Sequence, residues 1–533
     1  MKHWQRFAIA MLAVVCLFSS ITALAVEENV FPIGDGSTKL SLYLPMWDGN
    51  NVLYSSLMEH PSLQKYCEIT GIELELVEPP MGDDGTFFNM VITSGEYPDI
   101  FYAGDMMTYP GGADGAIEDG IILNHNELVE QYASNYLSIY NSASQADQRK
   151  MRTAAGVYKF VKIGSNVIEG IMNSGLVMRQ DFLDAVGMSA PKTIDELTAA
   201  LRAFKTELNV EVPLALPSIT DTMVTSCDSL AGAFGATTNK FMLDENGNVT
   251  HGYLQEGYAD FLALLQTWMS EGLIDIDSIN RTASDCLKMT YTGISGAAFA
   301  GCFQVMEMLT LGQSENPEYN IVGVNTMRLD DPDQQLTLCG VNHTFSGGAG
   351  NFWISTTCED PVAAIRFIDG LYNEDINLLF TFGVGELEDG NWTYVEENGE
   401  RQYSDYIMNN PDIPYGTMRF VAYLQQLTSR TLDSLEMQQY GYDLCQQCWD
   451  AWSYHVDDSR LIPASVTLTA EENAERNEIM TDLDIYMLEG AYNIICGDEP
   501  VEKWAEYVAT AKDLGIDRAV EITQAAYDRY LNG

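Results

Sequence analysis

Residues 175–204 read GLVMRQDFLDAVGMSAPKTIDELTAALRAF and predict a strand, a short helix, a turn and a second helix. Gly175–Arg179 is short and mostly apolar, as expected of a buried strand. Gly187 follows the first helix, where a residue without Cβ adopts a left-handed backbone without strain. Thr193 and Glu196 have the spacing of a capping box that opens the second helix. Apolar residues then recur on one face of that helix, at Ile194, Leu197, Leu201, Phe204 and Leu208.

Before this unit, the chain alternates between strand and helix patterns. Strands are predicted at Lys39–Pro45, Ile72–Val77 and Asp99–Tyr102, with helical segments between them. This alternation is typical of a parallel α/β sheet, in which ligands bind at the carboxyl ends of the strands. Those ends carry four candidate ligand-binding residues, namely Trp47, Asp48, Tyr102 and Asp105.

A second set of strands follows the opening unit, at Gly296–Gly301, Tyr319–Asn325 and Asn351–Ser355. Phe303 lies just past the first of them, and Trp353 lies within the third. A chain of 533 residues is too long for a single core, so at least two lobes are expected. Because the opening unit stands between the two sets of strands, we interpret it as the crossover from one lobe to the next.

The chain is strongly acidic, with 77 acidic and 27 basic residues and a formal net charge of −50. Because such a field repels polyanions, the composition argues against nucleic-acid binding. A strongly anionic oligosaccharide is disfavoured as a ligand for the same reason, although a locally basic pocket can hold one. We interpret the charge as a source of solubility for an exported protein.

The first 25 residues have the pattern of a secretory signal peptide. Two basic residues precede an apolar core at Phe7–Leu17, and Ala23–Ala25 fits a cleavage site. Cys16 lies inside the apolar core and is not preceded by the Gly or Ala of a lipid-attachment site. We therefore expect cleavage after Ala25, no lipid anchor, and a location at the extracellular face of the cell envelope or in the periplasm. No later stretch of the sequence is long and apolar enough to span a bilayer.

The remaining cysteines form an odd, scattered set that does not resemble a disulfide framework. Two of them belong to a CQQC motif at 445–448, which would suit a redox pair or half of a zinc site. No second CxxC and no nearby histidine pattern accompany it, so we expect structural thiols or a local disulfide and no metal. The sequence contains no GxSxG, HExxH or P-loop motif, and we expect neither catalytic residues nor a cofactor.

Four passages of the chain are distinctive in their order and spacing. They are PDIFYAGD at 98–105, the opening unit, DPVAAIRFIDGLYNED at 360–375 with FGVGE after it, and LGIDRAVEITQAAYDRY at 514–530. These passages resemble the extracellular solute-binding proteins of carbohydrate ABC transporters, in the lipoprotein-type branch of family 1. In the opening unit, the matching positions are Arg179, Asp181, Phe182, Leu183, Gly187, Pro191, Thr193 and Glu196.

The resemblance implies an α/β, type II periplasmic-binding-protein fold with two interleaved lobes, a hinge of crossover strands and a helical C-terminus. Lobe one would comprise residues 26–174 and 346–410, and lobe two residues 175–345 and 411–533. Gly175–Met178 would be the first crossover, and Phe345–Trp353 the return. The lobes would close on a carbohydrate, and permease subunits in the membrane would recognise the closed form. Such a protein is expected to be a monomer without enzymatic activity.

Calcium binding is not expected. Many relatives carry a calcium loop rich in Asp, Asn and Gly, and the matching place here, Glu207–Pro217, lacks that composition. Asp244, Asn246 and Asn248 loosely suggest another cation loop, but Gly247 is misplaced for an EF-hand.

The candidate site combines residue types that suit a sugar, because aromatic rings stack on sugar faces and acids or arginine pair with hydroxyls. The candidate plates are Trp47, Tyr102, Phe303 and Trp353, and the candidate polar partners are Asp48, Asp105, Arg179 and Glu386. Trp353 and Phe303 are as easily core residues, and Asp105 could cap a helix. We expect Arg179 to pair with a carboxylate across the hinge rather than with ligand.

Two other interpretations of the function remain open. A secreted glycoside hydrolase needs two carboxylates that flank the scissile bond, and acidic pairs are too common in this chain to identify one. A binding protein for peptides or another small solute would share the fold and differ only in its ligand.

Overall fold

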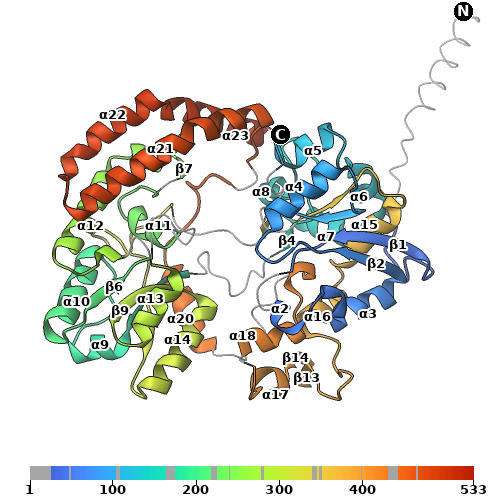
Figure 1. Ribbon diagram of the computed structural model, residues 1–533, viewed down its shortest axis with the longest axis horizontal. Coiled ribbons are helices and arrows are strands. Elements are labelled where there is room, and N and C mark those ends of the chain that lie inside the picture. Colours follow the sequence, from blue (N-terminus) through green and yellow to red (C-terminus); the bar gives the residue numbers. More distant parts are fainter. Residues whose placement is uncertain are drawn as a thin grey trace, which may run out of the picture.

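The computed structural model describes residues 26–46, 50–103, 109–163, 174–217, 225–238, 240–277, 281–338, 345–346, 351–397, 399–413, 415–429, 442–463 and 466–532. They form two α/β lobes that lie side by side (Figure 1). Lobe one contains the described residues of 26–163 and 351–429, and lobe two those of 174–338 and 442–532. The expected two-lobed α/β fold with a helical C-terminus is confirmed.

The sheet of lobe one has four strands, β1 (Thr38–Tyr43), β2 (Ile72–Val77), β3 (Ile100–Tyr102) and β12 (Phe352–Ile354). Their order is β12-β3-β1-β2. The first three strands are parallel, as their alternation with helices predicted, and β12 is antiparallel to β3. Because β12 lies far along the chain, lobe one is assembled from two separate stretches of sequence.

Helices cover both faces of this sheet, since neighbouring residues of β1, Leu42 and Tyr43, enter different core clusters. The helices of lobe one are α2 (Asn50–Leu53), α3 (Pro61–Thr70), α4 (Asp84–Ser94), α5 (Gly112–Glu118), α6 (Asn126–Tyr132), α7 (Ser134–Ser142), α8 (Gln145–Lys150), α15 (Pro361–Gly370), α16 (Glu374–Phe382), α17 (Asp405–Met408) and α18 (Tyr415–Met418). Short 3-10 turns follow at η1 (Leu57–Glu59), η6 (Arg419–Val421) and η7 (Gln425–Leu427), and β13 (Tyr394–Glu397) and β14 (Glu400–Tyr403) form a hairpin.

The sheet of lobe two contains β5 (Ser174–Arg179), β6 (Val212–Ala215), β9 (Ser295–Gly301) and β10 (Ile321–Gly323) in the order β10-β5-β9-β6. Only β6 and β9 are parallel, and β5 runs antiparallel to both of its neighbours. A separate hairpin is formed by β7 (Phe241–Leu243) and β8 (Val249–His251).

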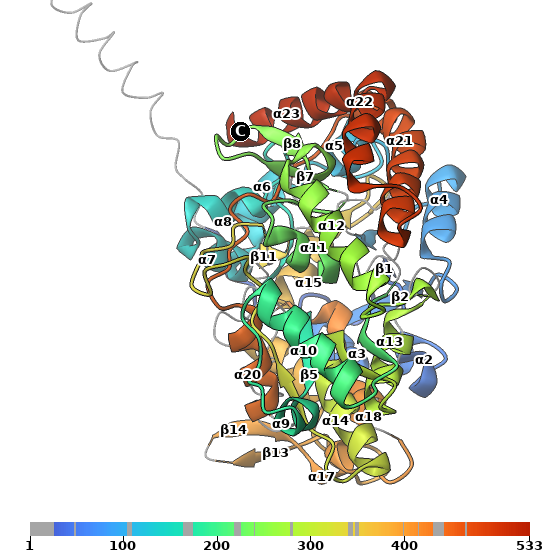
Figure 2. The ribbon, with the colours of Figure 1, turned by 90° about the vertical axis from the view of Figure 1, so that its left-hand side faces the viewer.

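The helices of lobe two are α9 (Gln180–Ala185), α10 (Ile194–Glu207), α11 (Thr225–Gly232), α12 (Gly257–Ser270), α13 (Ala283–Tyr291), α14 (Cys302–Glu315), α20 (Tyr442–Trp452), α21 (Ala470–Cys496), α22 (Trp504–Leu514) and α23 (Ile516–Asn532), with 3-10 turns at η4 (Gly252–Leu254) and η8 (Val501–Lys503). The last three helices form the top of this lobe, above α12 (Figures 1 and 2). They also reach lobe one, because a Cβ at Gly111 would lie 3.4 Å from the backbone nitrogen of Ala470. None of the helices in the described part of the chain is long and apolar enough to cross a membrane.

The opening unit folds as its sequence predicts, into β5, α9 and α10. Gly187 has a φ of 67°, and Thr193 Oγ1 accepts from the Glu196 backbone N–H at 3.3 Å. The Glu196 carboxylate departs from the expected capping box by one residue, because it accepts from the Lys192 N–H at 2.8 Å. The glycine and the helix cap therefore set the ends of the helices in this unit, and its apolar face packs into the core of lobe two.

The chain passes between the lobes three times, between residues 163 and 174, 338 and 345, and 429 and 442. Beside these passages, β4 (Lys162–Ile163) and β11 (Phe345–Ser346) pair as an antiparallel ribbon. The predicted crossover at Gly175–Met178 is wrong, because these residues pair with strands inside the sheet of lobe two. A short apolar run looks the same in a crossover as in a central strand, so the sequence could not separate the two.

The boundary expected at residue 410 also differs from the structure. Tyr415 and Met418 pack with Phe382 in lobe one, and Leu424 and Leu427 enter the main core of that lobe. The second stretch of lobe one therefore extends to residue 429. Nothing in the sequence of 411–429 indicated which lobe would hold it.

The CQQC motif lies on α20 and faces the sheet of lobe two. Cys445 and Cys448 are buried, and no disulfide joins them; burial raises the pKa of Cys448 to about 12. Because thiolate is the reactive form, such a thiol is inert toward oxidants at neutral pH. The expectation of structural thiols is confirmed, and the alternative of a local disulfide is wrong.

Gly175, the first residue of the opening unit, is required by close packing. The Trp452 ring lies over it and donates its indole N–H to the Leu176 carbonyl at 3.0 Å, and a Cβ at Gly175 would come within 2.3 Å of that ring. We expect Gly175→Ala to lower the free energy of unfolding by roughly 1–3 kcal/mol through overpacking. Urea denaturation measures this loss. Gly416→Ala, on α18 with open space around its Cα, is the matched control and should cost nothing.

Candidate functional site

The three passages leave lobe one at a single edge of its sheet. The Ile163 N–H donates to the Ser429 carbonyl at 2.7 Å, so the first and third exits lie together. Phe160 forms an isolated bridge with Phe352, which lies opposite Tyr102 at the carboxyl end of β3. The carboxyl ends of the parallel strands therefore form the edge from which the chain passes to lobe two, where ligands bind in open α/β sheets.

A small niche lies at this edge and has a volume of about 10 Å³. Its lining includes Tyr102, Lys162, Phe352, Gln426, Thr428 and Ser429. Lys162 donates to the Gln425 carbonyl at 3.2 Å and brings a positive charge to the niche. A cavity of this size holds about one water molecule, so the niche by itself is too small to enclose a sugar ring.

Two buried amides beside the niche are incompletely satisfied. Gln426 is 2% exposed, and its Nε2 donates to the Pro45 carbonyl at 3.1 Å and to Asn50 Oδ1 at 3.4 Å. Within the described part of the chain, the other half of each amide, Gln426 Oε1 and Asn50 Nδ2, has no hydrogen-bond partner. An unsatisfied buried polar group costs about 1–3 kcal/mol. Each amide therefore keeps one hydrogen-bonding atom available.

Tyr102 is the one predicted site residue that the structure places at the niche. Its ring lies 5.0 Å from that of Phe352, centroid to centroid. Burial raises the pKa of Tyr102, so the phenol stays protonated and can donate a hydrogen bond. Trp47, Asp48 and Asp105 lie outside the described residues, as does the side chain of Phe303.

Trp353 is a core residue in this structure, which corrects its assignment as a ligand plate. Its side chain is fully buried, its indole N–H donates to the Ala103 carbonyl at 3.0 Å, and its ring stacks on His125 at 5.7 Å. The two neighbours of Trp353 in β12 face the other side of the sheet. Because helices cover both faces of the sheet, the side chains of β12 are buried on whichever face they lie.

Arg179 is neither a ligand contact nor an anchor across the hinge. It lies at the opposite end of β5 from Ser174, about 17 Å from the end that adjoins lobe one. Its Nε donates to Asp181 Oδ1 at 2.7 Å, and its guanidinium lies 4.0 Å from the Phe182 ring and 4.5 Å from the Tyr319 ring. The predicted carboxylate partner is therefore two residues away, within lobe two.

Glu386 is exposed in the turn between α16 and β13, where its backbone bridges to that of Trp392. No contact among the described residues links Glu386 to the niche.

Gln426 and Asn50, the two amides beside the niche, were not predicted from the sequence. The only signal for Gln426 was a polar run, QQLTS at 425–429.

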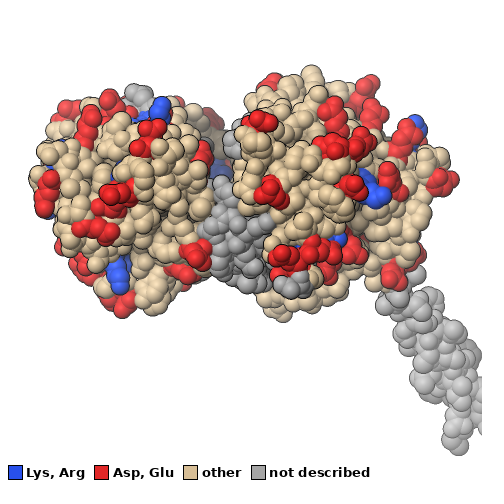
Figure 3. Space-filling model, turned by 90° about the horizontal axis from the view of Figure 1, so that it is seen from below, with Lys and Arg blue, Asp and Glu red and all other residues tan. Residues whose placement is uncertain are grey.

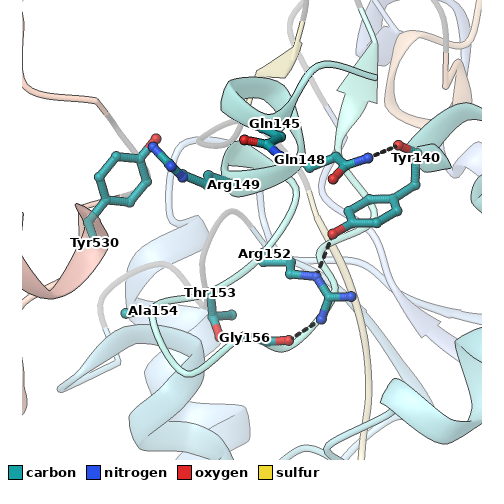
Figure 4. A pocket seen from close by; sticks show the side chains of 9 residues that line it. All are labelled: Tyr140, Gln145, Gln148, Arg149, Arg152, Thr153, Ala154, Gly156 and Tyr530. Carbon is teal, nitrogen blue, oxygen red and sulfur yellow. Dashed lines mark hydrogen bonds between the residues drawn. The ribbon is translucent and has the colours of Figure 1, made fainter. Parts of the chain in front are cut away.

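A second, larger cavity lies between the lobes and has a volume of about 450 Å³. Lobe one supplies α8 and the turn that follows it, and lobe two supplies Tyr530 from α23 (Figure 4).

On the face of the molecule seen in Figure 3, acidic residues are scattered over both lobes, with few Lys or Arg among them. Within the described residues, no group of three His, Cys, Asp or Glu side chains could hold a metal ion.

Comparison with known proteins relates the chain to one fold. No family model matches it. Lipoprotein LipO of Bacillus subtilis (strain 168) is 23% identical over 365 residues, which is 64% of this chain and 67% of that protein.

Solved structures match nearly the whole chain. The alginate-binding protein AlgQ2, solved without calcium ion, has a TM-score of 0.70 at 20% identity, covering 94% of this chain and 100% of that one. An HMO-binding, ABC-transporter-associated solute-binding protein from Bifidobacterium longum infantis has a TM-score of 0.76 at 16% identity, covering 93% and 99%. At these identities, the likeness establishes the fold that the chain shares with them.

Proposed function

We propose that this chain, which has the two-lobed fold of the solute-binding proteins of ABC transporters, binds a carbohydrate outside the cytoplasm and delivers it to permease subunits in the membrane. The observation that carries the proposal is the pair of half-satisfied amides, Gln426 and Asn50, at the edge where the chain passes between lobes. Sugar hydroxyls both donate and accept, so one ligand can satisfy the free oxygen and the free N–H together. Two proteins of similar structure are named as binding alginate or HMO, which supports a saccharide as the ligand.

Binding proceeds by closure of the lobes on the ligand. A ligand that contacts both lobes binds the closed form better and shifts the population toward it. The short β4–β11 ribbon lies beside the passages about which the lobes would move. No bond is broken in this cycle, and the protein acts as a monomer without enzymatic activity. We further propose that residues 1–25 direct export, that they are removed after Ala25, and that no lipid anchor is attached.

The amide pair gives a direct test of the site. We expect Gln426→Ala to weaken saccharide binding about tenfold, because it removes one buried hydrogen bond of roughly 1.4 kcal/mol. Isothermal titration calorimetry with the saccharide that most raises the melting temperature measures this loss. Gln335→Ala, an exposed glutamine in lobe two, is the matched control and should bind as the unaltered protein does.

Two results would contradict the proposal at different levels. Unchanged affinity in Gln426→Ala would remove the niche from the binding site while leaving the function standing. A panel in which no mono- or oligosaccharide raises the melting temperature, while a peptide or polyamine does, would exclude the carbohydrate.

A further inference from the structure

The larger cavity contains two arginines that lack carboxylate partners. Arg152 donates to the Tyr140 hydroxyl at 2.8 Å and to the Gly156 carbonyl at 2.5 Å, and its guanidinium lies 3.7 Å from the Tyr158 ring centroid. All these partners are neutral. The Arg149 side chain is exposed, and among the described residues it has no hydrogen bond or ion pair. Figure 4 shows Tyr530 reaching toward Arg149 from the other lobe.

Carboxylate partners are available to arginines elsewhere in the chain. Many of its other arginines pair with carboxylates, as Arg179, Arg202, Arg281, Arg366, Arg518 and Arg529 do. With 77 acidic and 27 basic residues in the chain, such partners are abundant. Two arginines that face a cavity of about 450 Å³ without one therefore have charge left for a ligand.

The segment of chain around the cavity is basic, whereas the protein as a whole is acidic. Residues 148–168 contain no Asp or Glu, yet they carry five basic residues, Arg149, Lys150, Arg152, Lys159 and Lys162. Two carboxylates adjoin this segment and have partners of their own: Asp147 pairs with Lys150 at 3.6 Å, and Asp114 accepts from the Ala155 N–H at 3.1 Å. A concave site of one sign concentrates ligands of the opposite sign, even against an unfavourable net charge.

We infer that this cavity is an anion subsite, which binds a carboxylate or sulfate carried by an acidic oligosaccharide. Arg149 presents the planar fork that pairs with both oxygens of such a group. Arg152 is held in place by the rings of Tyr140 and Tyr158 and adds a second charge. Because Arg149 and Tyr530 belong to different lobes, an anion held between them favours the closed form.

The subsite and the niche can serve one ligand. Gly156 lines the cavity and Phe160 lines the niche, and the four peptide units between them span at most about 14 Å. Lys162 lies at the niche end of this stretch. The ligand is therefore a saccharide longer than one ring, with its acid group in the cavity and its hydroxyls at Gln426.

This inference rests on the proposed carbohydrate function, and one experiment separates the two. Titration calorimetry on the full chain uses a panel of uronate trisaccharides, each beside its neutral methyl ester, together with a sulfated galactose trisaccharide. We expect at least one acid to bind at least tenfold more tightly than its ester, and Arg149→Gln to abolish that preference. Comparison of the uronates with the sulfated sugar identifies which anion the site takes.

Lys65→Gln is the matched control, because it removes one positive charge from an exposed site on α3 of the same lobe. It should keep the preference for the acid. Equal binding of every acid and its ester, or an unchanged preference in Arg149→Gln, would overturn the anion subsite. If no saccharide of either kind binds, the carbohydrate function itself fails, and the subsite with it.

Discussion

Lowering the pH from 6.5 to 5 is expected to destabilise the protein by about 5 kcal/mol, because three histidines are buried in their neutral form. Burial lowers the pKa of His60 to about 4, that of His125 to about 4, and that of His251 to about 3. All three are at most 1% exposed. Each unfolded histidine takes up a proton near pH 6.5, whereas the folded one does not, so stability present above pH 6.5 is lost as the pH falls toward the folded pKa.

Burial is the main reason that these rings resist protonation, and in His60 and His251 the acceptor role of Nδ1 also opposes a second proton. His60 Nε2 donates to the Phe420 carbonyl at 3.1 Å, and its Nδ1 accepts from the Ser62 N–H at 3.2 Å as the cap of α3. His251 Nδ1 accepts in the same way from the Tyr253 N–H. A second proton on either ring would set two donors face to face. Each histidine therefore contributes about 1.5 kcal/mol to the loss over this interval.

Calorimetric melting temperatures between pH 7 and 5 measure the effect. The interval lies above the range in which the salt-bridged carboxylates titrate, since pairing lowers the pKa of Glu271, Glu472 and Glu475. His60→Asn keeps an acceptor at the helix cap and should remove about a third of the loss. His455→Gln, at an exposed position, should remove none. A flat stability profile down to pH 5 would show that the buried rings accept protons.

Trp353→Ala is expected to lower the free energy of unfolding by about 3–5 kcal/mol, the range for loss of a large aromatic side chain from a core. The indole fills a cluster with Tyr43, Phe88 and Phe101, and its N–H satisfies the Ala103 carbonyl. The substitution removes both contributions and leaves a cavity beneath α5. Urea denaturation measures the change, and titration of the folded fraction with ligand shows whether affinity follows.

Trp392→Ala is the matched control, because that side chain is 50% exposed and its loss should change stability by no more than about 0.5 kcal/mol. Trp353→Phe keeps most of the packing and should recover most of the lost stability. A Trp353→Ala protein that unfolds normally but no longer binds saccharide would restore the tryptophan to the ligand site.

The fold was predictable wherever the signal was local. The strands at Ile72–Val77 and Gly175–Arg179 are found where their apolar patterns placed them, and Gly187 has the left-handed backbone that its position required. Each of these features depends on residues a few positions apart. The chain order of strands and helices was therefore sufficient for an α/β fold with two sheets.

The candidate site was predictable only in part. The rule that ligands bind at the carboxyl ends of parallel strands led to Tyr102, which lines the niche. It could not lead to Gln426, because the partner of that amide, Asn50, lies 376 positions away in the sequence. Arg179 and Trp353 were chosen for residue types that suit a sugar equally well inside a core.

The sequence by itself determined the local elements, the excess of acid, the basic run around residue 152 and the likeness to a family of binding proteins, because each is written in adjacent residues or in their order. Only the tertiary structure decided that β5 lies inside a sheet, that residues 411–429 belong to lobe one, and that Trp353 is buried. These outcomes depend on which distant surfaces exclude water from one another. The periodicity of apolar residues indicates that a side chain is buried, but only the folded chain shows which surface it packs against.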